Sequence, residues 1–367
     1  MNLYTINRGV SKRLHIYFSN RSRKKMYHDK INNLVKEFKP KPLSNNQISE
    51  IKEYYASFGF NDVKTCWHRY CTHISGEFHK EYIPEDIFYN LIEPRLNMYK
   101  MHPALTDKNL LSRLFSNVKQ PEIIIKNLNG CYYDGEDNRL IQIEEVINKC
   151  KKYSKLVIKP SIDSGGGKNV IVFALKGDKT DYNNLSIKDF LKLYDKNFSI
   201  QGFIRQNRQM NLLNPSSVNT LRIVSLLMDN EVDILTSVCR IGAIGGKIDN
   251  ISQGGLACRI SSNGLLSEKG YLKSGRSVLE TGTEIKLKDF KIPNFNKIIK
   301  EVQSLHKQIP YFKLISWDLA IDDKGEIILI EYNVRSQEIL GLQFFNGPLF
   351  GVHTDKILSS CDLNGKA

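Results

Sequence analysis

The most informative stretch of the sequence is residues 315–333, which read Ile-Ser-Trp-Asp-Leu-Ala-Ile-Asp-Asp-Lys-Gly-Glu-Ile-Ile-Leu-Ile-Glu-Tyr-Asn. Two apolar runs flank Asp-Asp-Lys-Gly, a composition typical of a tight turn. The segment is therefore predicted to form a β-hairpin that turns at residues 322–325. A turn centred there pairs Ile321 with Glu326 and sets the register of the whole hairpin.

Three polar residues of this hairpin are candidate metal ligands. In the predicted register Asp318 faces Leu329, and because side chains alternate along a strand, Asp318, Glu331 and Asn333 share one face. The two carboxylates are then diagonal neighbours, roughly 7–8 Å apart at the backbone. Two carboxylates with an amide oxygen suit Mg²⁺, which is commonly held by one or two carboxylates and nucleotide phosphates. An exposed acidic hairpin is the alternative, but Glu331 interrupts a very apolar strand.

A glycine-rich turn precedes this hairpin in the sequence, at residues 157–170, Val-Ile-Lys-Pro-Ser-Ile-Asp-Ser-Gly-Gly-Gly-Lys-Asn-Val. An apolar strand ends in Lys159, and Ser164, Gly165, Gly166 and Gly167 follow in a loop before the next strand. Consecutive glycines let backbone N–H groups converge on a phosphate, and a strand-borne lysine adds a point charge. The spacing fits neither a Walker A loop nor a dinucleotide-binding fingerprint. A flexible hairpin turn is the alternative.

Two further segments are candidates for substrate contact. Arg222 lies in an otherwise apolar strand after Asn219, where a guanidinium needs a fixed anion, either a phosphate or a structural carboxylate partner. Residues 242–255 form a long glycine-rich connection that contains Asn250, Gly254 and Gly255. This connection fits a substrate loop or a mobile surface loop equally well.

Around these motifs the chain reads as an α+β protein in four parts. Strands and helices mix without a regular βαβ repeat. We expect a basic, mainly helical region at residues 1–104, a first lobe at 105–205, a second lobe at 206–355 and a tail at 356–367.

The charge of the chain is uneven. The total is +14, and residues 1–50 hold eleven Lys or Arg against three Asp or Glu, a net charge of +8. Such an arm attracts an anionic membrane or an acidic polysaccharide, and a solvated surface without a partner is the alternative. We expect no specific nucleic-acid role. The absence of an apolar leader or membrane span and the seven scattered cysteines predict a cytoplasmic protein, with a peripheral position at the inner membrane face as the alternative.

The order of these motifs resembles that of the ATP-grasp superfamily, which includes D-alanine–D-alanine ligase, glutathione synthetase and biotin carboxylase. The resemblance covers about residues 105–350 and implies an ATP-grasp fold of two α+β lobes with ATP between them. It implies Lys108 and Lys159 as phosphate ligands, Lys159 and Arg222 as catalytic residues, and Asp318, Glu331 and Asn333 as Mg²⁺ ligands. The adenine hinge corresponds to Gln201, Phe203 and Ile204, with Gln201 in place of the usual glutamate.

A closer resemblance is to the sugar-transfer-associated ATP-grasp branch, which is associated with surface polysaccharides such as capsule. It rests on Asp107-Lys108-Asn109, on residues 217–222 and 249–255, and on the aromatic region 55–105. The expected activity is an ADP-forming carboxylate–amine ligase acting on glycan-linked substrates. A kinase of a glycan hydroxyl and a non-catalytic basic protein that binds an anionic polymer are the alternatives. The candidate substrate residues are Asn219, Asn250, Gly254, Gly255 and Arg335. The helical region stands where many such ligases have a Rossmann-like domain.

Overall fold

The computed structural model describes residues 3–162, 169–246, 254–273 and 275–361, with side chains from residue 21 onward. The chain divides into two compact units, Met1–Met98 with Arg335–Ala367 and Tyr99–Val334. The sequence placed residues 335–355 with the second lobe, whereas here they group with the N-terminal residues. Among the described residues, no helix has both the length and the apolar character needed to cross a membrane.

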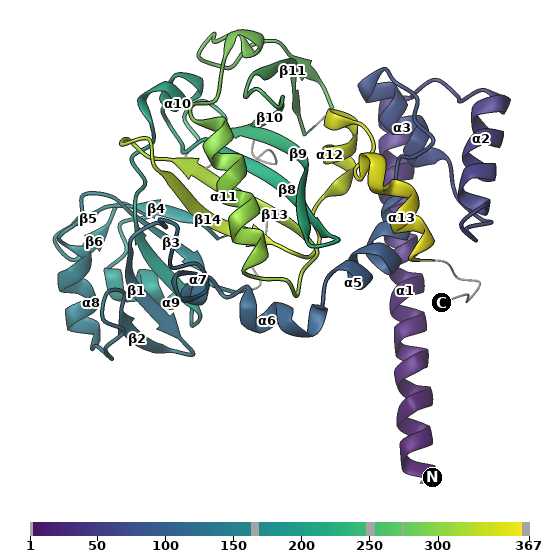
Figure 1. The fold of residues 1–367 in the computed structure, drawn as a ribbon. Helices are drawn as coiled ribbons and strands as arrows, with labels where there is room; N and C mark the ends of the chain where they lie inside the picture. The colour runs from purple at the N-terminus through teal and green to yellow at the C-terminus, as the bar shows by residue number, and fades with distance from the viewer. Residues whose placement is uncertain (1–2, 163–168, 247–253, 274, 362–367) are drawn as a thin grey trace. The chain divides into compact units, whose positions relative to one another are not determined.

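The first unit is helical, as the sequence predicts. Its elements are α1 (Leu3–Phe38), α2 (Asn45–Ala56), α3 (Cys66–Ser75), α4 (Glu85–Ile87), the π-helix η1 (Phe88–Ile92), α5 (Glu93–Leu96), α12 (Ile339–Asn346), η6 (Gly351–His353) and α13 (Thr354–Ser359) (Figure 1). Helix α2 begins with a capping box, in which Ser44 Oγ accepts from Gln47 N–H and the Gln47 side chain accepts from Ser44 N–H.

The second half of α1 packs into the core of this unit and is not a free arm. Ile31 is fully buried in a cluster with Trp67, Tyr70, Cys71, Tyr82 and Leu340. Lys30 Nζ donates to Glu85 Oε1 over 2.8 Å, and a ring nitrogen of His28 lies 2.9 Å from Asp86 Oδ2. Tyr27 also belongs to this packed part of α1, because its ring stacks on Tyr89.

The second unit begins with short helices and a five-stranded antiparallel sheet in the order β2-β1-β7-β3-β4. Its elements are η2 (Tyr99–Met101), α6 (His102–Leu105), η3 (Lys108–Leu110), α7 (Leu111–Leu114), β1 (Ile123–Leu128), β2 (Cys131–Asp134), α8 (Ile143–Cys150), β3 (Leu156–Pro160), β4 (Ile171–Phe173), β5 (Leu175–Lys176), β6 (Lys179–Thr180), α9 (Ile187–Lys192) and β7 (Phe198–Gly202). Strands β5 and β6 form a separate pair. One face of the five-stranded sheet forms a core through Ile125, Ile158 and Ile200, which pair across β1, β3 and β7.

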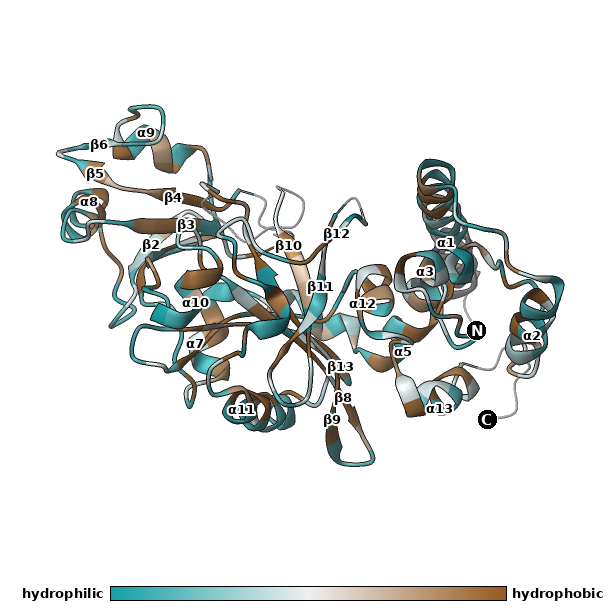
Figure 2. Cartoon of the chain, turned by 90° about the horizontal axis from the view of Figure 1, so that it is seen from above, coloured by the Kyte–Doolittle hydropathy of each residue, from teal (hydrophilic) through white to brown (hydrophobic). Residues whose placement is uncertain are grey.

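A seven-stranded antiparallel sheet follows, in the order β12-β11-β10-β9-β8-β13-β14. Its elements are α10 (Arg208–Leu213), β8 (Thr220–Met228), β9 (Glu231–Ile241), β10 (Leu256–Ile260), β11 (Leu266–Leu272), β12 (Ser277–Val278), η5 (Leu287–Asp289), α11 (Phe295–Lys307), β13 (Leu314–Ile321) and β14 (Ile327–Asn333). Figure 2 shows that strands β8 and β13 are mostly hydrophobic along their length. The antiparallel sheets and the mixture of helices and strands confirm the predicted α+β class.

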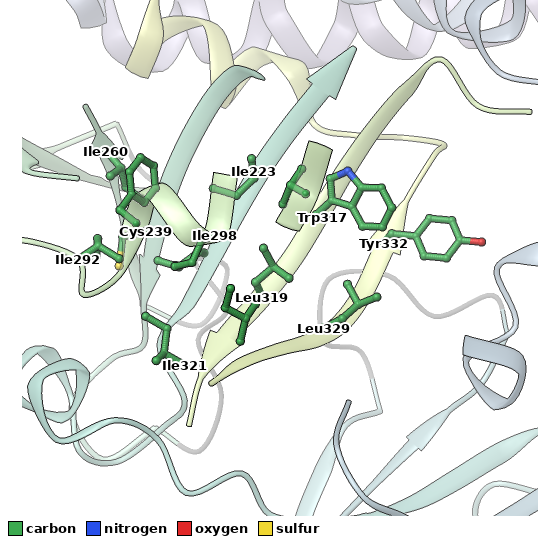
Figure 3. Close-up of a cluster of buried hydrophobic side chains, with 14 of the residues drawn as sticks. Ile223, Cys239, Ile260, Ile292, Ile298, Trp317, Leu319, Ile321, Leu329 and Tyr332 are labelled. Atoms are coloured by element: carbon green, nitrogen blue, oxygen red, sulfur yellow. The ribbon is translucent and has the colours of Figure 1, made fainter. Parts of the chain in front are cut away.

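Helix α11 covers one face of this larger sheet. Ile298 of α11 packs with Ile223 of β8, with Trp317 and Leu319 of β13, and with Leu329 of β14 in the largest core cluster (Figure 3). Because side chains alternate, the residues between them on the same strands point to the opposite face. That opposite face carries Arg222 and Asp318, so one apolar face supports a sheet whose other face is charged.

Candidate active site

The charged face of the larger sheet holds a row of three ionisable residues. Asp318 of β13 pairs directly with Arg222 of β8 on one side and with Glu331 of β14 on the other. The row therefore crosses three neighbouring strands at one level. Directly opposed residues are the closest side-chain neighbours in an antiparallel sheet, with Cβ atoms about 5 Å apart.

The hairpin register predicted from the sequence was wrong. Asp322, not Ile321, closes the turn, because Asp322 N–H donates to the Glu326 carbonyl and the Asp322 carboxylate accepts from Lys324 and Glu326 N–H. Leu319 then pairs with Leu329, but Asp318 pairs with Glu331. A β-bulge at residue 330 accounts for the shift.

The bulge decides which way Glu331 points. Without it, residues 327, 329 and 331 would share one face, and that face is the core packed against α11. The extra residue lets Tyr332 follow Leu329 into the core and turns Glu331 to the face of Asp318. The sequence therefore predicted the correct face for Glu331 through an incorrect register.

Asp318 is buried and held by two guanidinium groups. Arg222 donates in a bidentate manner, Nε to Oδ1 over 2.9 Å and Nη2 to Oδ2 over 2.8 Å, and Arg240 Nη2 lies 3.3 Å from Oδ2. Asn333 Nδ2 also donates to Oδ2, over 3.2 Å. Burial would raise the pKa of Asp318, but Arg222 and Arg240 outweigh it, and a hydrogen bond with Glu331 adds to their effect, so the pKa falls to about 2.

Two lysines interact with Glu331, Lys108 at the start of η3 and Lys159 on β3 of the smaller sheet. Lys108 Nζ lies 3.2 Å from Glu331 Oε2, and Lys108 N–H donates to the carbonyl of Ser161, just beyond the end of β3. Lys159, the last residue of β3 before Pro160, is buried. Burial lowers its pKa to about 8; repulsion from Lys108 acts in the same direction, and attraction to Glu331 opposes both.

Gln201 of the predicted adenine hinge lies on the same face of the smaller sheet as Lys159. Lys159 pairs with Ser199, and Gln201 pairs with Val157 two residues further along β7. Gln201 is buried and its Nε2 donates to Ser199 Oγ over 3.3 Å. Strand β7 ends at Gly202, so Phe203 and Ile204 lie beyond it. The Phe203 ring faces the ammonium group of Lys155, 3.7 Å from its centroid.

The described candidate substrate residues fall in both units. Asn219 is buried, and its Nδ2 donates to the carbonyls of Met210 and Asn214, which gives it a structural role in the loop before β8. Arg335 is exposed and belongs to the first unit. Gly254 has a φ of +90° and precedes Gly255 at the start of β10. The loop residues Ser164, Gly165, Gly166, Gly167 and Asn250 lie outside the described residues.

Sequence reasoning missed Arg240, which stands on β9 directly opposite Thr220. Its Nε and Nη2 donate to Thr220 Oγ1 over 3.0 and 2.9 Å, and the same guanidinium reaches Asp318. The signal was available, because Arg240 interrupts an apolar strand just as Arg222 does. The structure also gives Arg222 the carboxylate partner that the sequence offered as the alternative to phosphate.

The donor set fits a divalent cation with a polyphosphate. Asp318 and Glu331 face each other beside the Asn333 amide, which provides the oxygen ligands that Mg²⁺ prefers. Around these two carboxylates stand four cations, Lys108, Lys159, Arg222 and Arg240. The described side chains of this cluster therefore carry two positive charges in excess, a balance that favours an anionic ligand.

Comparisons with known proteins identify the family of this chain. The family model described as sugar-transfer associated ATP-grasp matches residues 89–356, more than two thirds of the chain. The chain therefore belongs to the sugar-transfer-associated ATP-grasp family and has the ATP-grasp fold, as the sequence predicted. A search of curated protein sequences gave no match.

Several solved structures are similar to the chain at low identity. The biotin carboxylase domain of the 2-oxoglutarate carboxylase from Hydrogenobacter thermophilus is 14% identical over 73% of this chain and 48% of its own length, with a TM-score of 0.42. D-alanyl-alanine synthetase A from Vibrio cholerae is 12% identical over 71% and 66%, with a TM-score of 0.38. L-amino acid ligase from Bacillus licheniformis is 12% identical over 70% and 48%, with a TM-score of 0.39. The matched region thus spans about half to two thirds of these proteins.

Proposed function

We propose that this protein is an ATP- and Mg²⁺-dependent carboxylate–amine ligase that forms an amide and releases ADP and phosphate. The observation that carries the proposal is the pairing of Asp318 with Glu331 across β13 and β14, with Lys108 3.2 Å from Glu331. A surface that only binds a polymer has no need for two opposed carboxylates among buried cations. Family membership is independent support, because the family model matches residues 89–356 as a whole and not only Asp318, Glu331 and Lys108.

Lys108 and Lys159 bind the phosphates of ATP in this proposal. Both ammonium groups are largely shielded from solvent, so their attraction for a phosphate oxygen is weakly screened. Lys159 is fixed on a strand, and the backbone N–H of Lys108 is tied to the end of that strand. Their positions are therefore set before nucleotide arrives, which lowers the entropic cost of binding. Gln201, Phe203 and Ile204 would contact the adenine.

Mg²⁺ would be held by Glu331, Asp318 and Asn333, and it would offset negative charge on the phosphates during transfer. Asn333 donates its Nδ2 to Asp318, so its Oδ1 is the atom available to a cation. Asp318 shares its oxygens with Arg222. Arg240 keeps Asp318 paired when Arg222 turns toward a phosphate, because Thr220 fixes the Arg240 guanidinium independently.

The reaction balances in two steps without a protein nucleophile. A carboxylate oxygen of the substrate attacks the γ-phosphorus, the bond to the bridging oxygen breaks, and ADP leaves. The amine nitrogen then attacks the acyl carbon, phosphate leaves with the bond electrons, and the amine loses a proton to solvent. Lys159 and Arg222 stabilise the transferring phosphoryl group by charge, the term that dominates such transfers.

The substrates in this proposal are a carboxylate and an amine, at least one of them linked to a surface polysaccharide such as capsule. The description of the family, which refers to sugar transfer, supports this choice. We place the reaction in the cytoplasm, at the inner membrane face. There the basic N-terminal residues, with a net charge of +8 over residues 1–50, would meet an anionic membrane or acidic glycan.

Product analysis tests the reaction. The full-length protein is incubated with γ-labelled ATP, Mg²⁺, hydroxylamine and a panel of carboxylated sugars and glycan fragments. A ligase releases labelled inorganic phosphate and forms a hydroxamate from the activated carboxylate. Label on a glycan hydroxyl would instead establish a kinase. A protein that binds acidic glycan but turns over no ATP with any carboxylate would overturn the enzymatic proposal altogether.

A further inference from the structure

Lys108 occupies the position beside Glu331 where a divalent cation would bind. The Lys108 and Glu331 side chains are 11% and 24% exposed, and their charged atoms lie 3.2 Å apart. Lys159 also interacts electrostatically with Glu331. Water screens such a pair only weakly, so Glu331 is neutralised by protein cations before any ligand is present.

Asp318 is neutralised in the same way by Arg222 and Arg240. Both carboxylates of the candidate metal site are therefore committed to basic side chains in the ligand-free protein. A bare divalent cation would have to displace an ammonium group from Glu331 and leave that group beside a second positive charge. This cost opposes the binding of metal alone.

A polyphosphate removes the obstacle. Its oxygens offer Lys108 and Lys159 a new acceptor, and with each lysine that turns to phosphate Glu331 becomes available to the metal. The Lys108 ammonium would then move from carboxylate to phosphate, and Glu331 would be free to hold the metal. At the end of this exchange the lysines would be paired with phosphate and Glu331 with the metal.

We propose that Lys108 determines the ligand specificity of the site: it excludes bare divalent cations and admits a metal only together with a nucleotide. The inference rests on the proposed nucleotide function and adds to it the role of one lysine as a barrier to metal. It implies a reciprocal coupling, in which nucleotide raises metal affinity and metal raises nucleotide affinity by the same factor.

The first experiment measures metal binding without nucleotide. Full-length protein is titrated with Mn²⁺, and free Mn²⁺ is followed by electron paramagnetic resonance. Lys108→Met should bind bare Mn²⁺ about tenfold more tightly than the wild type, a typical size for such coupling. Lys119→Met is the matched control, because Lys119 pairs with Asp322 and Glu326 at the other end of the same hairpin.

Adding ADP to these titrations measures the coupling itself. ADP should tighten Mn²⁺ binding about tenfold in the wild type and in Lys119→Met, and by clearly less in Lys108→Met. Thermal unfolding confirms that each variant is folded, and Lys108→Gln replaces Lys108→Met if the latter is not.

The second experiment uses Glu331→Gln and metal-free ADP in the presence of EDTA. Removing the carboxylate releases Lys108 for phosphate, so this variant should bind metal-free ADP severalfold more tightly than the wild type. Unchanged Mn²⁺ affinity in Lys108→Met, or weaker binding of metal-free ADP by Glu331→Gln, overturns the inference while the proposed function stands. A wild-type protein that binds no ADP even with Mn²⁺ overturns the proposed function instead.

Discussion

The hairpin β13–β14 carries a lysine–carboxylate cluster at each end, and the two clusters differ in exposure more than in distance. At the turn, Lys119 lies 2.6 Å from both Asp322 and Glu326, with the lysine 45% exposed. At the open end, Lys108 lies 3.2 Å from Glu331 with the lysine only 11% exposed. The shorter contacts belong to the cluster that solvent screens more strongly.

The lysines at the two ends of the hairpin also differ in the direction of their pKa shifts. Lys119 has two carboxylate partners and its pKa is raised by hydrogen bonds to Asp322 and Glu326. Lys159 has its pKa lowered to about 8 by burial, and Glu331 offsets this only in part. The turn thus holds a satisfied lysine with a structural role, whereas the open end holds cations that a ligand can still stabilise.

The largest expected effect is on turnover. Glu331→Gln should lower ATP turnover at least about a thousandfold, because it removes charge stabilisation worth several kcal/mol from the metal site. Asp318→Asn should have a similar effect. The matched change at the turn, Glu326→Gln, should leave turnover within about twofold. Steady-state release of phosphate at saturating Mg²⁺ measures the turnover of all three variants. Turnover at the wild-type rate in Glu331→Gln would contradict a metal site at the open end of the hairpin.

Asp318→Asn should also lower the free energy of unfolding, by about 3–5 kcal/mol, because two guanidinium groups lose a buried partner. Its folded fraction is therefore measured by circular dichroism before its turnover is interpreted.

On the opposite face of the same sheet, the buried side chain of His306 should make the free energy of unfolding depend on pH, because it has no charged partner. A ring nitrogen of His306 lies 2.6 Å from Ser225 Oγ, and the other nitrogen bonds the Phe312 carbonyl. Burial lowers the pKa of His306 from 6.5 to about 4, against the smaller effect of the Phe312 carbonyl. The folded state thus keeps His306 neutral, so its contribution to stability is complete above pH 6.5 and is lost as the pH falls toward 4, about 3 kcal/mol in all.

Urea unfolding at pH 7 and pH 4.5 tests this expectation. His306→Leu should be less stable than the wild type at pH 7 and should lose less stability on acidification. The exposed His73→Gln serves as the control and should follow the wild type at both pH values. Equal acid sensitivity of the wild type and His306→Leu would show that His306 does not stay neutral in the folded state.

A smaller effect is expected for nucleotide affinity. Lys159→Met should weaken ADP binding by about tenfold to thirtyfold, roughly one charge-assisted hydrogen bond, whereas Lys119→Met should not change it. Phosphate stabilises the charged lysine, so binding in wild type should take up a proton above about pH 8, and affinity should fall as the pH rises through 8. Calorimetry in buffers of different ionisation enthalpy measures this uptake. Proton release, or no uptake at pH 9, would place Lys159 away from the phosphates.

The smallest effect on turnover is expected for the basic residues before Tyr27. Deleting residues 1–26 removes seven Lys or Arg and no acidic residue, and it spares Tyr27 and Ile31, which belong to the core cluster of the first unit. The truncated protein should bind anionic vesicles more weakly at low salt, by about 1 kcal/mol for each cation that contacts the surface. Turnover of a small carboxylate should be unchanged. Co-sedimentation at low and high salt measures vesicle binding, and equal binding by the two proteins would assign these residues to a solvated surface.

Most elements of the fold could be predicted from the sequence because their signals are local. The hairpin at residues 315–333 follows from two apolar runs around a glycine turn. The extent of the α1 core was not predictable in the same way. Ile31 is buried by Trp67 and Leu340, residues distant in the sequence, and a single amphipathic pattern does not name its partners.

The candidate site shows the same division between local and long-range information. Asp318, Glu331 and Asn333 were predicted to share a face, and the structure brings them together. Their register was wrong, because a bulge leaves no signature among Ile, Leu and Ile. Arg240 was missed although its position in an apolar strand gave the same signal as Arg222.

The bulge at residue 330 reverses which face of the sheet each later side chain of β14 points to. A strand has only two faces, so the addition or loss of one residue exchanges every position downstream of it. Removing Ile330 would deliver Glu331 and Asn333 to the apolar core and bring Tyr332 to the charged face, although no chemical group of the site had been altered. In this strand, a one-residue deletion is therefore a more severe change than most substitutions.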